Sequence, residues 1–383
     1  MHRTVVALAV TALLLVASGC NGPIDRISWF YKPPTTAGGQ NDPSDALAEH
    51  LAHDYIGTMV LTHKDESYRD RLVGLGHAKP LQYVMSFEID TLATNGHPYG
   101  NNWGWGDEPG DQDTYAWILA NHQDWILGFT SWGGTWRAYL DPGNTGFQAW
   151  AVQRANYART NWGWDAGLFL DNLDGGLGRT LAPTYDGVTA TNRYAADEPA
   201  FHAAVKSFVR AMKAGYPGTV WANLTFNDAA SWKRVPGAGE DYFDVGLDGA
   251  MEEGAFVGWT NTGWSSTSQW LADLGRFEHT ISRRKGLLAV CQNRVAGGPG
   301  DQARARFCYG SFLLVADGRY ANFRSPDDGY SKDHWLPEHD IALGAPIGGR
   351  TQNPDGSWSR AFQRQTVTVD PVAHTVTFTP RPT

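Results

Sequence analysis

Carboxylate side chains directly follow two apolar runs in this sequence. Asp171 follows the run 167–170, and the adjacent Glu252 and Glu253 follow the run 249–251. A carboxyl group at the end of such a run is held partly out of water. When two such groups are neighbours, their pKa values move apart, so that one can act as an acid and the other as a base. Such a pair can hydrolyse a glycosidic bond: one group protonates the leaving oxygen, and the other attacks the anomeric carbon or activates water.

Amide and aromatic side chains stand at similar positions, where they could hold a sugar. Amides hydrogen-bond to hydroxyl groups, and indole rings offer flat apolar faces. The residues that we expect to bind substrate are Trp29, Glu88, Trp103, Trp105, Asn172, Asp174, Asn223, Gln292 and Asn322. Simpler interpretations stay open, because Asp171 and Asp174 could cap a helix or turn and Trp29 could be a core residue.

Eight apolar, β-rich runs could position these groups. They cover 27–31, 56–62, 81–87, 167–171, 219–224, 249–252, 287–292 and 320–323. They are continuous rather than alternating, as in parallel strands that are covered on both faces. Helical patterns lie between them, at 44–54, 147–162, 198–214, 268–284 and 303–316. The alternation predicts an α/β fold of the (β/α)8 TIM barrel type, whose active site lies at the C-terminal ends of the strands.

Two segments do not fit the alternation. The stretch 91–146 is too long for a connection, is rich in Trp and contains two short β-like runs, so we interpret it as an insert after strand three. The last residues alternate with period two around Asp370-Pro371, which predicts a small C-terminal β-hairpin packed on the barrel. The expected domains are a catalytic barrel at 27–345 and an extension at 346–383.

The first residues have the features of an export signal. A short basic start precedes an apolar run at 5–17 that is too short to span a bilayer, and VASGC at 16–20 resembles a lipobox. We expect residues 1–19 to be a signal peptide, Cys20 to carry a lipid and residues 20–26 to form a tether. This predicts an exported protein of the bacterial cell envelope, anchored to the membrane by lipid. The alternative is an ordinary secretion signal with an incidental Cys.

Composition and cysteine content limit the partners. The chain has 31 Lys+Arg against 40 Asp+Glu, a net charge of −9, which gives no electrostatic basis for nucleic-acid binding. No His spacing indicates a metal site, and no phosphate-binding or dinucleotide motif indicates a cofactor. We expect a monomer. In an oxidising compartment Cys291 and Cys308 should form a disulfide; two buried thiols are the alternative.

Four short motifs resemble a group of glycoside hydrolases that includes glycoside hydrolase family 114 and the hypothetical "glycosyl hydrolase-like 15" proteins. The motifs are FLDNLD at 169–174, YLDPGN at 139–144, GAMEEG at 249–254 and RAF at 360–362. The resemblance spans roughly residues 27 to 379. It implies a (β/α)8 barrel that acts on a polysaccharide. Family 114 members are retaining enzymes that cleave α-1,4-linked galactosamine polymers.

The resemblance also implies roles for the carboxylates. Asp171 would be the nucleophile or base, and a glutamate of strand six the general acid/base. Two adjacent glutamates stand where the family has one, and they must point to opposite faces of a strand. We favour Glu253, because it stands directly before Gly254-Ala255-Phe256 as the family acid does, and keep Glu252 as the alternative. The competing hypothesis is a non-catalytic glycan-binding lipoprotein, in which the two carboxylates need not converge.

Overall fold

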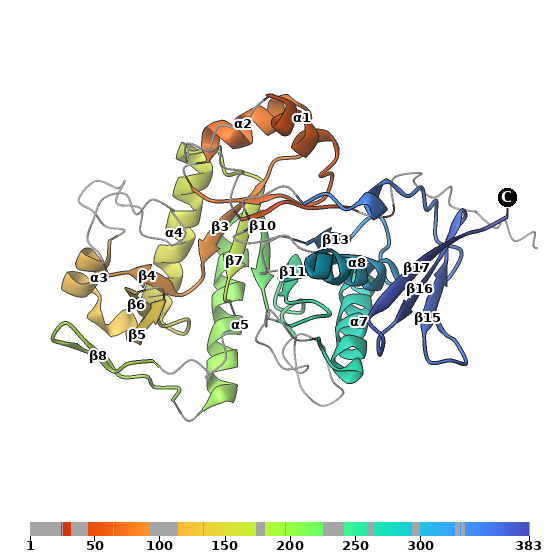
Figure 1. Ribbon diagram of the computed structural model, residues 1–383. Helices are drawn as coiled ribbons and strands as arrows, with labels where there is room; N and C mark the ends of the chain where they lie inside the picture. Colours follow the sequence, from red (N-terminus) through yellow and green to blue (C-terminus); the bar gives the residue numbers. More distant parts are fainter. Residues whose placement is uncertain are drawn as a thin grey trace, which may run out of the picture.

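A curled parallel sheet forms the centre of the computed structural model (Figure 1). Its strands, in spatial order, are β1 (Phe30–Tyr31), β2 (Val60–Leu61), β3 (Leu81–Met85), β7 (Gly167–Asp171), β10 (Thr219–Asn223), β11 (Gly249–Glu253), β12 (Gly286–Val290) and β13 (Ala321–Arg324). All neighbouring pairs are parallel. Each predicted apolar run overlaps one of these strands, so the predicted α/β fold with a parallel sheet and covering helices is confirmed.

The structure describes most of the chain outside its N-terminus and several loops. The described residues are 24, 26–31, 45–63, 65–91, 114–132, 134–173, 181–195, 197–224, 241–258, 264–292, 299–325, 330 and 334–382.

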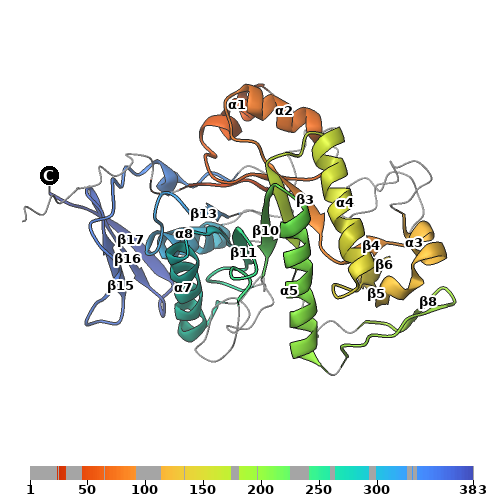
Figure 2. The same ribbon diagram turned by 180° about the vertical axis from the view of Figure 1, so that it is seen from behind.

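Helices cover the outer face of the sheet. They are α1 (Asp45–His53), α2 (Glu66–Gly74), α4 (Thr145–Asn161), α5 (Glu198–Gly215), α7 (Thr267–Ser282) and α8 (Pro299–Leu313). Figures 1 and 2 show α4 and α5 side by side on one flank and α7 and α8 on the other. Local sequence defines where they begin, since Asn144, Asp197 and Ser266 each accept hydrogen bonds from amides of the first helical turn.

The two faces of the sheet have separate apolar cores. The enclosed face is lined by Phe30, Val60, Leu81, Tyr83, Met85, Phe169, Met251, Leu288 and Val290. The outer face packs against the helices, for example against the buried stripe of α5 that contains Phe201, Val205 and Phe208. Because a strand turns alternate side chains to opposite faces, position along each strand decides which core a residue joins.

The first and last strands also approach each other. Ile27 and Phe323 form an isolated parallel bridge. The Ser28 amide donates to the Phe323 carbonyl at 2.8 Å, and the Phe323 amide donates to the Arg26 carbonyl at 2.9 Å. Backbone hydrogen bonds therefore join the segment before β1 to β13.

The segment between β3 and β7 forms its own small sheet. It contains β4 (Glu88–Asp90), α3 (Tyr115–Asn121), the 3-10 helix η1 (Gln123–Trp125), β5 (Ile126–Trp132) and β6 (Thr135–Leu140). The three strands are antiparallel in the order β4-β6-β5. The predicted β-like runs are thus β5 and β6. A short hairpin of β8 (Thr184–Tyr185) and β9 (Val188–Thr189) contacts β5 through the bridge between Phe129 and Ala182.

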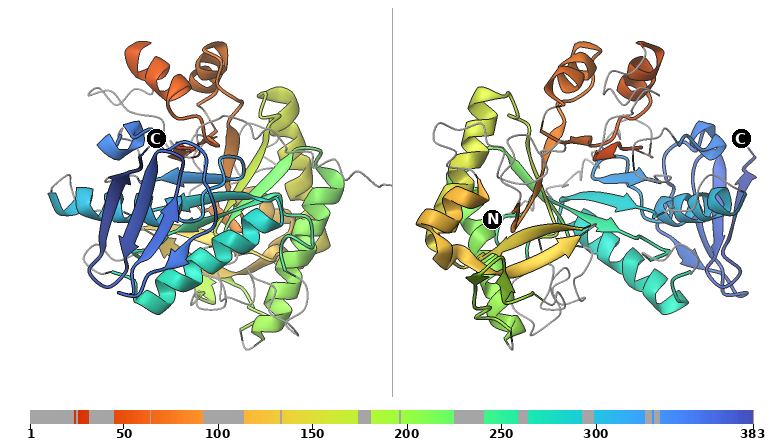
Figure 3. Two further views of the ribbon diagram at one scale, coloured as in Figure 1. Left: turned by 90° about the vertical axis from the view of Figure 1, so that its right-hand side faces the viewer. Right: turned by 60° about the vertical axis from the view of Figure 1, so that its left-hand side comes forward.

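The C-terminal residues form a larger unit than a hairpin. After the 3-10 helix η2 (Pro337–Asp340), a four-stranded antiparallel sheet follows: β14 (Thr351–Gln352), β15 (Trp358–Ala361), β16 (Gln365–Asp370) and β17 (Thr375–Pro380). Its β16 and β17 are the strands on either side of Asp370-Pro371. Figure 3 shows this sheet beside α8, on the side of the molecule opposite the β4-β6-β5 sheet.

Candidate active site

The two candidate carboxylates are the last residues of two strands. Asp171 ends β7 and Glu253 ends β11, and β10 lies between them in the sheet. Their exposed fractions are 9% and 7%. The C-terminal strand ends thus bring two nearly buried carboxyl groups to one edge of the sheet, as the strand-end rule predicts.

A single amide group links the two carboxylates. Asn223, the last residue of β10, donates from Nδ2 to Asp171 Oδ1 at 2.8 Å and to Glu253 Oε2 at 2.9 Å. The two acceptor oxygens are therefore at most about 6 Å apart, a separation at which two carboxyl groups can act on the same glycosidic bond. Asn223 itself is 1% exposed.

Asp171 receives further donors from its surroundings. The Tyr83 hydroxyl donates to Oδ2, and the backbone amide of Asn172 donates to Oδ1 at 2.9 Å. Asn172 has a φ of 50°, a left-handed conformation that Asn tolerates better than most residues and that ends the strand. Hydrogen bonds to the carboxylate oxygens favour its ionised form.

Glu253 is held from the far side of the site. Gln292 donates from Nε2 to Glu253 Oε1 at 2.7 Å, and the Tyr330 hydroxyl donates to the same oxygen. Gln292 also contacts the Tyr330 hydroxyl, so these residues form one network. The structure therefore brings the side chains of Asn223 and Gln292 and the backbone amide of Asn172 to the two carboxylates.

Three residues of this site were not predicted: Phe30, Tyr83 and Tyr330. The Phe30 ring centroid lies 5.5 Å from that of Tyr330 and 6.1 Å from that of Tyr83, so Phe30 packs against both tyrosines whose hydroxyl groups donate to the carboxylates. Tyr83 lies within the predicted strand 81–87, and it could have been found as the polar aromatic residue two positions before the end of the observed β3. Tyr330 lies in a loop at a φ of 64°, for which the sequence offers no signal.

Glu252 points away from the site, which argues against the alternative assignment of the acid. Its carboxylate lies 3.2 Å from Arg276 of α7, on the face of β11 opposite Glu253. Asp273 also contacts Arg276. Burial raises the pKa of Glu252 to about 8, since the charged form loses more from desolvation than it gains from Arg276. Strand alternation explains this placement.

Two expected substrate ligands are structural. Trp29 is fully buried, and the Arg324 guanidinium lies 4.3 Å from the centroid of the Trp29 ring. Its neighbour Phe30 faces the enclosed core, so Trp29 faces the helices on the other side of the strand. Asn322 is the second residue of β13 rather than its last. Its amide donates to the carbonyls of Leu287 and Tyr320, and its Oδ1 accepts from the Thr58 amide at 2.9 Å. Both side chains thus make structural contacts instead of lying with the two carboxylates, where the sequence analysis expected them.

Glu88 lies in the inserted sheet. It belongs to β4, not to the end of β3, and its Oε2 pairs with Arg137 of β6 at 2.9 Å. Asp90 pairs with the same guanidinium at 2.9 Å. Both carboxylates are buried, so the ion pairs fix β4 against β6. This differs from the predicted role of Glu88 as a sugar ligand.

Some predicted residues fall outside the described part of the chain. These are Trp103, Trp105, Asp174 and Cys20.

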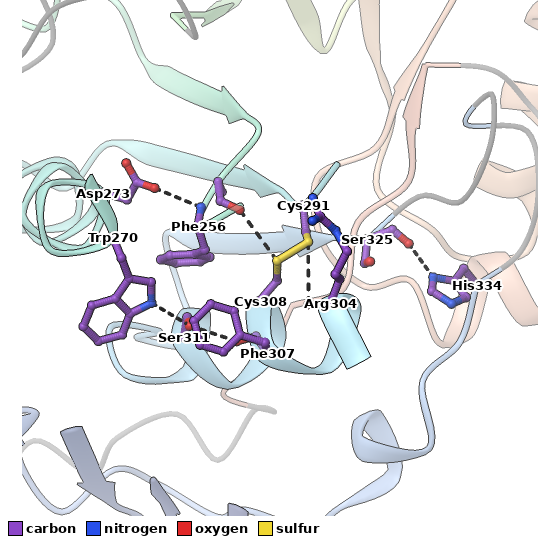
Figure 4. Close-up of a disulfide and its surroundings, with 11 residues drawn as sticks. Phe256, Trp270, Asp273, Cys291, Arg304, Phe307, Cys308, Ser311, Ser325 and His334 are labelled. Atoms are coloured by element: carbon purple, nitrogen blue, oxygen red, sulfur yellow. Dashed lines mark hydrogen bonds between the residues drawn. A yellow bond between two sulfur atoms is a disulfide. The ribbon is translucent and has the colours of Figure 1, made fainter. Parts of the chain in front are cut away.

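The structure contains the predicted disulfide between Cys291 and Cys308 (Figure 4). The Cα atoms are 6.1 Å apart. Cys291 immediately precedes Gln292, and Cys308 lies in α8. The bond expected from the sequence therefore connects the end of β12, next to a partner of Glu253, to the covering helix.

The described residues hold neither a metal-binding cluster nor a helix that could span a membrane. Within these ranges, no group of three or more His, Cys, Asp or Glu side chains could hold a metal ion. No helix in the same ranges is both long and apolar enough to cross a membrane.

Comparisons with known proteins give the chain a family. The sequence pattern described as hypothetical glycosyl hydrolase family 15 matches residues 81–366. No curated protein matches the sequence. Similar solved structures include the glycoside hydrolase domain of PelA from Pseudomonas aeruginosa, with 16% identity over 80% of this chain and 96% of that one and a TM-score of 0.48. An α-galactosidase from Thermus thermophilus has 14% identity over 91% of this chain and 67% of that one, with a TM-score of 0.46.

Proposed function

Since the chain belongs to hypothetical glycosyl hydrolase family 15 and is a glycoside hydrolase, we propose that Asp171 and Glu253 are its catalytic pair and that it retains anomeric configuration. The observation that carries this proposal is the amide of Asn223, which contacts both carboxylates. The Asp171 and Glu253 oxygens that accept from this amide are at most about 6 Å apart, which is compatible with the roughly 5–5.5 Å between the carboxyl groups of retaining enzymes.

Asp171 and Glu253 each accept three hydrogen bonds, so the division of roles rests on the family resemblance, in which Asp171 is the nucleophile and the strand-six glutamate the general acid/base. Asp171 attacks the anomeric carbon and forms a glycosyl ester, while Glu253 gives its proton to the leaving oxygen. Glu253 then takes a proton from water, and the resulting hydroxide displaces Asp171 from the sugar. The proton gained by Glu253 restores the starting state.

We infer that the central sheet closes into a (β/α)8 barrel with residues 27–345 as its domain. The bridge between Ile27 and Phe323 supports closure. The segment 91–146 would be the insert after strand three, and residues 346–383 the C-terminal extension. The position of the carboxylates at strand ends places the substrate at the C-terminal mouth of such a barrel.

The substrate that we propose is a polysaccharide of a cell envelope or extracellular matrix. The resemblance to glycoside hydrolase family 114 suggests an amino-sugar polymer. A glycan-binding protein without turnover would not need two buried carboxylates to share one amide donor, so the geometry favours the enzyme over the binding lipoprotein.

The proposed location is the bacterial cell envelope, with the chain anchored through a lipid on Cys20. The VASGC stretch at 16–20 supports this proposal. Metabolic labelling with a radioactive fatty acid should mark the wild type and not Cys20→Ala, and only the wild type should remain with membranes after fractionation. Label retained by Cys20→Ala would refute the anchor site.

The enzymatic proposal is tested by reducing-end release from a panel of bacterial and fungal polysaccharides. A form beginning at Pro23 would be compared with Asp171→Asn and Glu253→Gln, each of which should lose at least about a hundredfold in kcat. Glu252→Gln is the matched control, and its loss should be below about tenfold because it faces α7. Proton NMR of the first product should show the anomer of the substrate. Binding without release by the wild type would favour the glycan-binding alternative.

A further inference from the structure

The turn that follows Glu253 has a strained backbone. Phe256 has a φ of 67°, in the left-handed region that bulky residues rarely adopt, and Gly254 has a φ of 114°. A residue in such a conformation persists only where its surroundings impose it. The contacts around residues 254–256 should therefore show what fixes this turn.

Helix α7 supplies those contacts. Asp273 accepts the Phe256 amide proton on Oδ2 at 2.9 Å, as Figure 4 shows. The Phe256 ring lies edge-on against Phe277 of the same helix, with centroids 5.3 Å apart. Asp273 is 2% exposed and Phe256 1%, so water does not compete for this hydrogen bond.

The same helix holds the residue on the other side of Glu253. Arg276 lies 3.2 Å from Glu252 and also pairs with Asp273. Gln269 completes the group by donating to Asp273 at 2.8 Å. The positions directly before and three after Glu253 are thus both tied to one buried polar cluster, which consists of Glu252, Asp273 and Arg276.

The disulfide supports the turn from a second side. Cys308 Sγ lies 3.6 Å from the Ala255 carbonyl oxygen (Figure 4). A disulfide sulfur has no hydrogen to donate, so this is a packing contact. The amides of Gly254 and Ala255 donate to the Val290 carbonyl at 2.9 and 3.0 Å, in the strand that leads to Cys291.

We propose that Asp273 is a positioning residue, which acts through Arg276 and the Phe256 amide to hold the Glu253 carboxyl group at the shared amide of Asn223. The inference rests on the proposed function for its kinetic part. A shift of about 1 Å in a catalytic group can lower the rate about a hundredfold, so a support outside the substrate site can affect catalysis strongly.

Crystal structures and kinetics of Asp273→Ala would test the proposal. We expect Glu253 Oε2 to leave hydrogen-bond distance of Asn223 Nδ2, and kcat to fall at least about tenfold with KM within about twofold. Asp273→Asn is the second variant if the Ala variant does not fold, because Asn keeps the shape and loses the charge. Thr280→Val, a buried change about two turns further along α7, should alter neither measurement.

Each outcome separates the two proposals. A Glu253 that stays in place in Asp273→Ala overturns the positioning role, whether or not kcat falls. A displaced Glu253 with unchanged kcat overturns it as well. A displaced Glu253 in a protein whose wild type cleaves no polysaccharide keeps the structural role of Asp273 and rejects the proposed polysaccharide substrate and catalytic pair.

Discussion

Asn223 has the strongest predicted effect among residues that are not themselves carboxylic acids. Its Nδ2 contacts Asp171 and Glu253, so Asn223→Ala removes one hydrogen bond from each. A hydrogen bond to a charged group contributes about 1.5–3 kcal/mol, and we therefore expect kcat/KM to fall about 10- to 100-fold or more. Reducing-end assays on purified variants would measure it.

The matched variant is Asn223→Asp. It has the same shape but offers only acceptor oxygens when ionised, so it places a third carboxylate between the other two. We expect it to be at least as impaired as Asn223→Ala. Wild-type activity in Asn223→Asp would show that the amide donor is not needed.

Glu252 predicts a pH dependence of stability. Its pKa is about 8 in the folded protein against 4.5 as the ordinary value, chiefly because of burial. Below pH 4.5 both states hold the proton. Between pH 4.5 and 8 only the folded state holds it, so ionisation of the unfolded chain lowers the free energy of unfolding as pH rises.

Glu252→Gln cannot ionise and lacks this contribution. Relative to wild type, it should therefore gain stability as pH increases from about 4.5 to 8, and its relative stability should level off above that range. Urea unfolding of both proteins at pH 4, 6 and 8 would measure the difference. A difference that is the same at all three pH values would contradict the raised pKa.

At the residue scale, sequence reasoning located groups at strand ends and failed where orientation mattered. Asp171, Asn223 and Glu253 follow apolar runs, and a parallel sheet brings such ends together. The sequence predicts Trp29 as a substrate ligand, whereas the structure turns the neighbouring Phe30 to the enclosed core. Both are large aromatics in a strand that is buried on both faces, so no polar alternation shows which one points inward.

At the scale of elements, the strand boundaries explain another error. The predicted run 320–323 ends one residue before β13 does. Asn322 was therefore expected near the C-terminal end of the strand, whereas it is the second of four residues in β13. Tyr330 comes from a loop that the register of the sheet does not fix. Local patterns thus predicted the elements, whereas loop residues that return to the site depend on tertiary packing.

The disulfide gives the prediction at this scale, because it ties β12 to α8. Closing a loop with a sequence separation of 17 should contribute about 3 kcal/mol, mainly by restricting the unfolded chain. We expect the double variant Cys291→Ala, Cys308→Ala to lose about that free energy of unfolding in urea. A reducing agent should destabilise the wild type to a similar extent and leave the double variant unchanged. Equal stability of oxidised and reduced wild type would contradict it.

At the scale of the whole molecule, α8 belongs to two layers. One of its sides packs on the central sheet, and the other carries the β14-β15-β16-β17 sheet (Figures 1 and 3). Gly310 of α8 meets Val369 and Val376, which are buried residues of β16 and β17. The terminal sheet should therefore unfold together with the rest of the protein and not as a separate domain.

Gly310→Ala tests this coupling. Alanine is a better helix former than glycine by about 0.8–1 kcal/mol, yet its Cβ would lie 2.3 Å from Val376 Cγ2. We expect the overlap to win, because overpacking costs about 1–3 kcal/mol, and the single melting transition of the whole protein to move to lower temperature. Gly74→Ala in α2 is the control: nothing lies within 4 Å of its added Cβ, so it should stabilise slightly.

Adding Val376→Ala to Gly310→Ala should cost less than the sum of the two single changes, since it removes the methyl group in conflict. Additive losses, or a low-temperature transition confined to the terminal sheet, would mean that this sheet is attached to α8 without depending on it.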